Sequence, residues 1–291
     1  MHIKRPFLLL IACLFFSYLR AQTGVVFKIK YLPEHSYETN ITTNMNAEMN
    51  ISGDEKEMEK IKAKGIKLPM IMTSVTTVGV NIKTGALKPG STFPITLNYA
   101  DLATKKTLNG KETTAAPSPL IGQTIYGECT SAGKMHLDSM SGKALDENLK
   151  ASLTSAINNM VNQMHFPEKP LNIGETFTQE VPFNLPISGI NMQFAIKIIY
   201  RLTTIENNSA FFDLDQSMSF DMATKKDSVT MTGKGTGKGD GKLIYSIEQN
   251  FPTSMSSNFD LSYQIKVENM TMTGRAKTSS THQTKISSIA K

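Results

Sequence analysis

Residues 37–52 alternate between two kinds of side chain without interruption, and this run constrains the fold more than any other feature of the sequence. The odd positions, from Tyr37 to Ile51, are apolar or threonine, and the even positions, from Glu38 to Ser52, are polar. Because side chains on a strand point alternately to opposite faces, the run predicts one strand with a dry face and a wet face. At about 3.3 Å per residue it would span roughly 50 Å, whereas an ordinary strand has about five or six residues.

The same alternation returns along most of the chain. It covers residues 70–82, 93–99, 192–202, 210–222, 229–249 and 259–267. Val25–Tyr31 also predicts a short first strand. We therefore expect a mainly β fold: a long-stranded, curved antiparallel sheet or an unclosed β-barrel with one central amphipathic helix.

That helix is expected near 144–165, where the apolar spacing changes from two residues to three or four. Its apolar stripe consists of Leu145, Leu149, Leu153, Ile157, Met160, Val161 and Met164. Pro167 ends it, because proline removes a helical hydrogen bond. The charged segment 54–64 is acidic first and basic last, which predicts a short helix at the tip of a hairpin.

The N-terminus resembles a secretory signal peptide. Lys4 and Arg5 precede an apolar run from Phe7 to Leu19, which is too short for a membrane span of about 20 residues. We expect residues 1–21 to be the signal, cleaved after Ala21, and residues 22–291 to form a single β-rich domain that is secreted or periplasmic. The competing interpretation is a lipobox ending at Cys13, which would make the chain an outer-membrane lipoprotein.

Composition excludes several classes of function. Beyond residue 21 no apolar run approaches 18 residues, so no helical transmembrane span is expected. The signal carries three basic residues and no acidic one, which leaves 28 basic against 25 acidic residues and argues against nucleic acid as a partner. Cys129 is then the single cysteine, so no internal disulfide can form; burial in a strand is the favoured interpretation over a reactive thiol.

No motif predicts catalysis, a metal or a cofactor. The glycines of residues 233–241 stand at every second position, which favours a strand facing something closely, such as aromatic rings, over a phosphate loop. Asp213 and Asp215 share the polar face of one predicted strand, without the rest of a calcium loop. No histidine pair has metal-ligand spacing, and no G-x-S-x-G sequence exists. We expect a protein that is not an enzyme.

The segment Phe166-Pro167-Glu168-Lys169-Pro170-Leu171-Asn172-Ile173-Gly174-Glu175-Thr176-Phe177 resembles a stretch of an uncharacterised family of secreted bacterial envelope proteins. Members typically carry P-x-x-P-x-x-x-G-[DE]-[ST]-[FW] after a helix and a Gly-alternating strand later. That family has no established activity, so the resemblance implies no catalytic residues. More loosely, the architecture is similar to the LolA and LppX-type lipoprotein carriers, which implies a half-barrel closed by helices over an apolar cavity.

One helix of about 20 residues is too little to cover such long strands, so either the sheet closes on itself or something apolar fills the gap. The first hypothesis is a non-enzymatic envelope protein that binds a hydrophobic ligand or lipid between sheet and helix. Its expected ligand-binding residues are Met45, Met49, Phe194, Ile198, Phe212, Met218, Leu153 and Ile157.

Two other hypotheses remain. One is a structural or protein-interaction module of the envelope without a small-molecule ligand, in which methionines fill an ordinary core. The other is an outer-membrane barrel, disfavoured by the absence of Trp and of aromatic girdles and by the non-aromatic last residues, Ser287–Lys291.

Overall fold

The computed structural model describes residues 24–114, 120–142, 147, 150–151, 153–155, 157–158, 166–187, 190–226 and 229–289. The predicted signal peptide, Cys13 and part of the predicted helix lie outside these residues. The described elements are β1 (His35–Ser52), α2 (Glu55–Ala63), β2 (Met70–Thr84), β3 (Thr92–Leu108), β4 (Lys111–Thr114), β5 (Thr124–Thr130), β6 (Met135–Met140), β7 (Thr176–Ile187), β8 (Ile190–Glu206), β9 (Ser209–Lys226), β10 (Val229–Ser246), β11 (Phe251–Val267) and β12 (Met270–Ser288).

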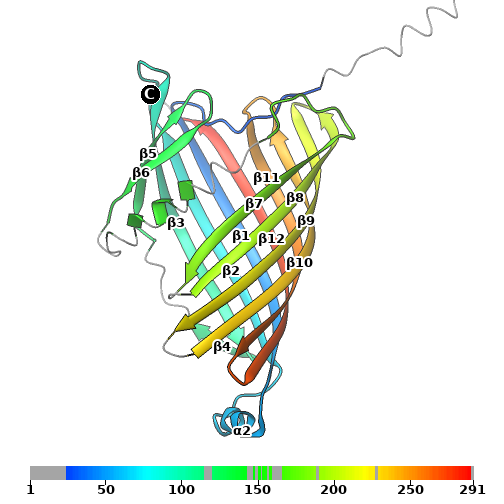
Figure 1. Ribbon diagram of the computed structural model, residues 1–291. Coiled ribbons are helices and arrows are strands. Elements are labelled where there is room, and N and C mark those ends of the chain that lie inside the picture. The colour runs from blue at the N-terminus through cyan, green and yellow to red at the C-terminus, as the bar shows by residue number, and fades with distance from the viewer. Residues whose placement is uncertain are drawn as a thin grey trace, which may run out of the picture.

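All twelve strands join one antiparallel sheet, which confirms the predicted fold class (Figure 1). Its hydrogen-bonded order is β6-β5-β3-β2-β1-β12-β11-β10-β9-β8-β7, with β4 paired to β3. The order contains two meanders, joined because the first strand pairs with the last along their whole length. Since β6 and β7 are the two ends of this order, the sheet is curved but not closed.

Local sequence explains the tight hairpins. Asn109 and Gly110 both adopt positive φ between β3 and β4, and Asn207 and Asn208 do so between β8 and β9. Two-residue turns of this kind match the twist of antiparallel strands and favour asparagine and glycine. Pro182 lies on β7, at the sheet edge, where no further strand requires the backbone hydrogen bond that proline cannot donate.

The short helix α2 lies between β1 and β2, as the charge pattern of residues 54–64 predicts. Asp54 caps it, since its Oδ1 accepts a hydrogen bond of 2.9 Å from the backbone N–H of Glu57.

Within the predicted central helix, every described residue between 147 and 158 is helical. Leu153 and Ile157 pack against buried side chains of the sheet.

Two buried clusters lie on the apolar face at one end of the sheet, which we call the core end; the opposite end, where β1 leads into α2, is the α2 end. The first core cluster consists of Tyr37, Ile82, Phe93, Ile95, Leu97, Ile125, Cys129, Met135, Leu137, Met140 and Phe251. The second consists of Phe27, Phe166, Leu171, Tyr200, Leu202, Ala210, Phe212, Leu214, Leu243 and Tyr245.

The prediction of a strand at Val25–Tyr31 is wrong. Apart from one bridge, Val25 with Leu171, the segment pairs with no strand. The Tyr245 hydroxyl instead donates to the carbonyl of Lys28 at 2.5 Å, while the Phe27 ring packs edge-on against Tyr245 at 5.1 Å. The segment thus covers the core end, and side chains rather than a neighbouring strand satisfy part of its backbone.

Candidate functional site

Apolar side chains continue along the same face toward the α2 end, but there they belong to neither core cluster. The half-buried methionines of this region include Met45, Met49, Met70, Met72, Met218 and Met272, and we call these six the methionine face. Strand register brings them together: Met49 lies opposite Met70, Ala47 opposite Met72, and Ile51 opposite Met272.

The methionine face lies on the concave side of the sheet. In Figure 1 the sheet curls so that β7–β10 pass in front of β1, β2 and β12. Along β1 the side chains of Asn44, Asn46 and Glu48 are exposed, whereas Met45 and Met49 between them are half-buried. Side chains crowd on a concave surface and splay on a convex one, so the polar residues line the outside and the methionines the inside.

Glycines shape the wall formed by β9–β11, which faces the methionines of β1 and β2. Gly235 on β10 lies opposite Phe220 on β9, and a Cβ placed at Gly235 would overlap the Phe220 ring. A Cβ placed at Gly237 would likewise overlap the ring of Phe259 on β11, which lies opposite Gly239, as the alternating glycines predict. The rings therefore lie across the backbone of the neighbouring strand instead of standing up from the sheet. This arrangement keeps the wall apolar and leaves room in front of it.

The predicted ligand-binding residues divide into three groups. Phe212 belongs to the second core cluster and Ile198 packs against it. Leu153 and Ile157 pack against the first core cluster. Met45, Met49 and Met218 lie on the methionine face, and the Phe194 ring lies 5.8 Å from that of Phe220, on the strand next to its own.

The prediction omitted residues that the register places beside Met45 and Met49. Met70 and Met72 stand on the adjacent strand, and Tyr263 lies across Gly274 on the next hairpin. Their alternation was visible in the sequence, but the strand pairing was not.

A band of polar side chains crosses the concave face between the core clusters and the methionine face. Thr43 and Ser280 share a hydrogen bond of 3.1 Å, and the Ser257 hydroxyl donates to Oε1 of Gln216 at 2.8 Å. Burial lowers the pKa of His282, which favours the neutral imidazole. The band separates the sealed core from the open apolar end.

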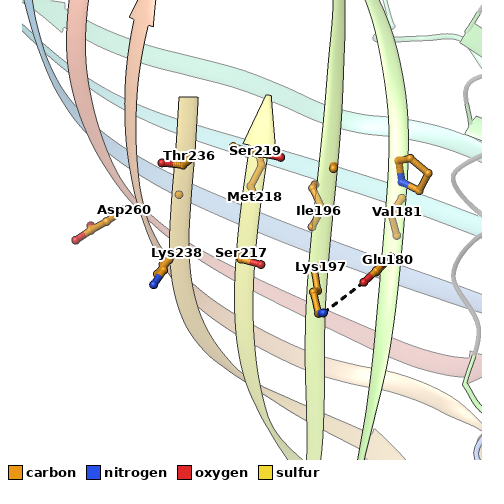
Figure 2. A pocket seen from close by; sticks show the side chains of 13 residues that line it. Glu180, Val181, Ile196, Lys197, Ser217, Met218, Ser219, Thr236, Lys238 and Asp260 are labelled. Atoms are coloured by element: carbon orange, nitrogen blue, oxygen red, sulfur yellow. Dashed lines mark ion pairs between the residues drawn. The ribbon is translucent and has the colours of Figure 1, made fainter. Parts of the chain in front are cut away.

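A pocket of about 680 Å³ lies on the opposite, polar face (Figure 2). It is lined by the small residues Ser217 and Ser219 and by Lys197, whose Nζ lies 3.4 Å from Oε1 of Glu180. Of the predicted ligand-binding residues, Met218 alone lines this pocket. The pocket therefore meets the methionine face only at Met218, and its other lining residues lie outside that face.

The described part of the chain contains neither a cluster of metal-ligating side chains nor a helix suited to crossing a membrane. Among those residues, no three histidine, cysteine, aspartate or glutamate side chains come close enough to hold a metal ion. Asp213 lies opposite Lys242 and Arg201, whereas Asp215 lies opposite Asp240. No helix within the described ranges is long and apolar enough to cross a membrane.

Cys129 is buried on β5, in agreement with the favoured interpretation of the sequence. Burial raises the pKa of its thiol to about 12, because the thiolate would lose its hydration. The native mature chain is therefore expected to react with a maleimide at least about a hundredfold more slowly than the unfolded chain, since the thiolate is the nucleophile. Stopped-flow labelling at pH 8 checks this, and equal rates would contradict it.

The same burial has a stability consequence. Between pH 9.0 and about 12 the unfolded chain loses the Cys129 proton while the native chain keeps it. Cys129 should therefore lower the free energy of unfolding as pH rises through this window, and Cys129→Ala should remove that part of the slope.

Comparisons with known proteins identify no family. No family model matches the chain, and no curated protein matches it either. Among solved structures, Pseudomonas aeruginosa OpdL aligns over 86% of this chain and 99% of its own, with 7% identity and a TM-score of 0.23. OccK5 (OpdH) of the same organism aligns over 85% and 98%, with 5% identity and a TM-score of 0.25. Likenesses this weak carry neither a fold assignment nor a function.

Proposed function

We propose that the chain is a non-enzymatic secreted or periplasmic envelope protein that holds an apolar ligand, such as lipid, against the methionine face. One observation carries the proposal: an apolar concave surface continues beyond both core clusters, and no described element packs over it. Apolar surface that remains in contact with water favours a binding partner, because leaving it in water costs about 25 cal/mol per Å².

The chemistry of the surface supports an acyl chain or a similarly flexible ligand. Methionine side chains are unbranched and polarizable, so they adapt to varied apolar shapes. The rings of Phe220 and Phe259 lie along the opposite wall, and Thr43 and Ser280 offer hydroxyl groups at the inner end of the surface. The looser resemblance to half-barrel lipoprotein carriers points in the same direction.

Native mass spectrometry tests the proposal on protein purified without detergent from its own envelope and then extracted with organic solvent. We expect a stoichiometric adduct that the solvent releases as lipid. A bare mass from all preparations would contradict the proposal and favour a structural or interaction module. The same spectrum determines whether the chain begins at Gln22 or carries a lipidated Cys13.

A double variant identifies the surface that holds the ligand. Met45→Gln with Met49→Gln places two amides on the methionine face at nearly unchanged size, and each unpaired buried amide costs about 1–3 kcal/mol. Adduct occupancy should fall at least about tenfold. The matched control, Asn44→Gln with Asn46→Gln, changes the exposed face of the same strand and should keep the adduct. Equal occupancy in both variants would place the ligand elsewhere.

A further inference from the structure

Three chain segments meet at the α2 end of the sheet. The side-chain amide of Asn269, in the β11–β12 turn, donates to Oδ2 of Asp54 at 3.3 Å. The amide of Asn109, in the β3–β4 turn, donates to the carbonyl of Lys67 at 3.3 Å, and its Oδ1 accepts from the Ile71 N–H at 2.8 Å. These contacts tie α2 and both turns into one surface, which we call the tip: residues 53–71, 105–112 and 266–270.

The tip is basic. It carries nine lysines and six carboxylates, and residues 60–67 read Lys-Ile-Lys-Ala-Lys-Gly-Ile-Lys without an acidic residue. Lys62, Lys64 and Lys67 are exposed, while Lys60 forms an ion pair of 2.6 Å with Glu57. The three exposed lysines are therefore available to an external anionic surface.

Exposed apolar side chains accompany these lysines. Ile66 is 36% exposed, Leu108 42% and Ile71 53%, and all three lie on the tip. Leu108 lies opposite Met72, so its side chain continues the methionine face, whereas Ile71 lies opposite Glu48 on the polar face. Basic and large apolar side chains on one surface are the combination that binds the interface of an anionic bilayer.

We infer that the tip docks on an anionic lipid surface, with the open end of the methionine face directed toward the bilayer. This inference rests on the proposed function, because it supplies the route by which an apolar ligand enters or leaves. The lysines provide long-range attraction, and Ile66 and Leu108 insert into the interface. An orientation with the core end toward the bilayer would present the sealed clusters instead.

Vesicle flotation of the full mature chain tests the docking. We expect binding to vesicles of phosphatidylglycerol and phosphatidylethanolamine, weak binding to phosphatidylcholine, and release at high salt, because salt screens exposed charges. The triple variant Lys62→Gln, Lys64→Gln, Lys67→Gln should weaken binding to anionic vesicles about a hundredfold, at about fivefold for each lysine.

The matched control removes the same charge from the outer face of the sheet, as Lys238→Gln, Lys242→Gln, Lys285→Gln. These lysines are exposed and lie away from the tip along β10 and β12, so this variant should bind vesicles nearly as the parent does. An equal loss in both triple variants, or equal binding to anionic and neutral vesicles, would overturn the inference. Unchanged thermal unfolding of each variant verifies that it is folded.

Native mass spectra of the same samples separate this inference from the proposed function. An adduct on a chain that binds no vesicles overturns the docking and leaves the proposed function intact. Lysine-dependent vesicle binding by a chain with a bare mass supports the docking surface and contradicts ligand binding. Loss of vesicle binding in the tip variant, with its adduct retained, supports both.

Discussion

Replacing Phe212 with alanine is expected to lower the free energy of unfolding by about 3–5 kcal/mol. The Phe212 side chain is 1% exposed, and its ring packs edge-on against Phe27 at 5.1 Å and at a tilt against Phe166 at 5.9 Å. Those two rings come from segments outside the sheet, so the cavity would loosen the N-terminal segment and the segment before β7 together. Equilibrium unfolding in urea measures the loss.

Met218→Ala is the matched control for this change. Met218 lies on the same strand and the same face, but it is half-buried and belongs to neither core cluster. Its truncation should cost about 1 kcal/mol or less, while reducing ligand occupancy more than Phe212→Ala does at equal folded fraction. Similar stability losses in the two variants would contradict the division into a sealed core end and an open α2 end.

The division into a sealed core end and an open α2 end could not be predicted from the sequence. Alternation correctly placed Phe212, Met218, Met45 and Met49 on an apolar face, because side-chain direction in a strand depends on the chain alone. Whether an apolar residue is sealed or open depends on what covers it. At the core end the cover includes Phe27, which no periodicity links to β9.

The wrong strand at Val25–Tyr31 has a related cause. Its residues have strand-like spacing, but the hydroxyl groups of Tyr37 and Tyr245 bond to the backbone at Leu32 and Lys28. A distant side chain can thus replace a neighbouring strand as hydrogen-bond partner, and no local pattern predicts it. The β1–β12 pairing was also unpredicted, since it joins the two ends of the chain.

The glycines of β10 are the one site feature whose role follows from sequence and structure together. Their spacing predicts a strand closely approached on one face, and the structure places the Phe220 ring across Gly235. Glycine in a strand weakens it, since it has no side chain to pack and loses more entropy on folding. The row of glycines is therefore expected to serve a purpose that offsets this loss of stability. We assign it the purpose of letting the aromatic rings of the wall lie flat against the sheet.

Gly235→Ala should accordingly lower the free energy of unfolding by about 1–3 kcal/mol, because the new methyl group displaces the Phe220 ring. In a Phe220→Ala background the same change should cost little, giving a coupling energy above about 1 kcal/mol in a double-mutant cycle. Gly233→Ala is the matched control. A Cβ added there would first meet the flexible end of Met222, at 2.8 Å, so the cost of this change should be independent of Phe220.

Measuring ligand occupancy in the four proteins of this cycle tests whether the glycines also keep space open for the ligand. A ring lifted from the wall by Gly235→Ala would project into the space in front of the methionine face, so the native adduct should fall even though no apolar group is lost. Phe220→Ala with Gly235→Ala should restore occupancy, since the obstruction is removed. If occupancy instead follows stability alone across the four proteins, the glycines serve the packing of the sheet and not the space that it encloses.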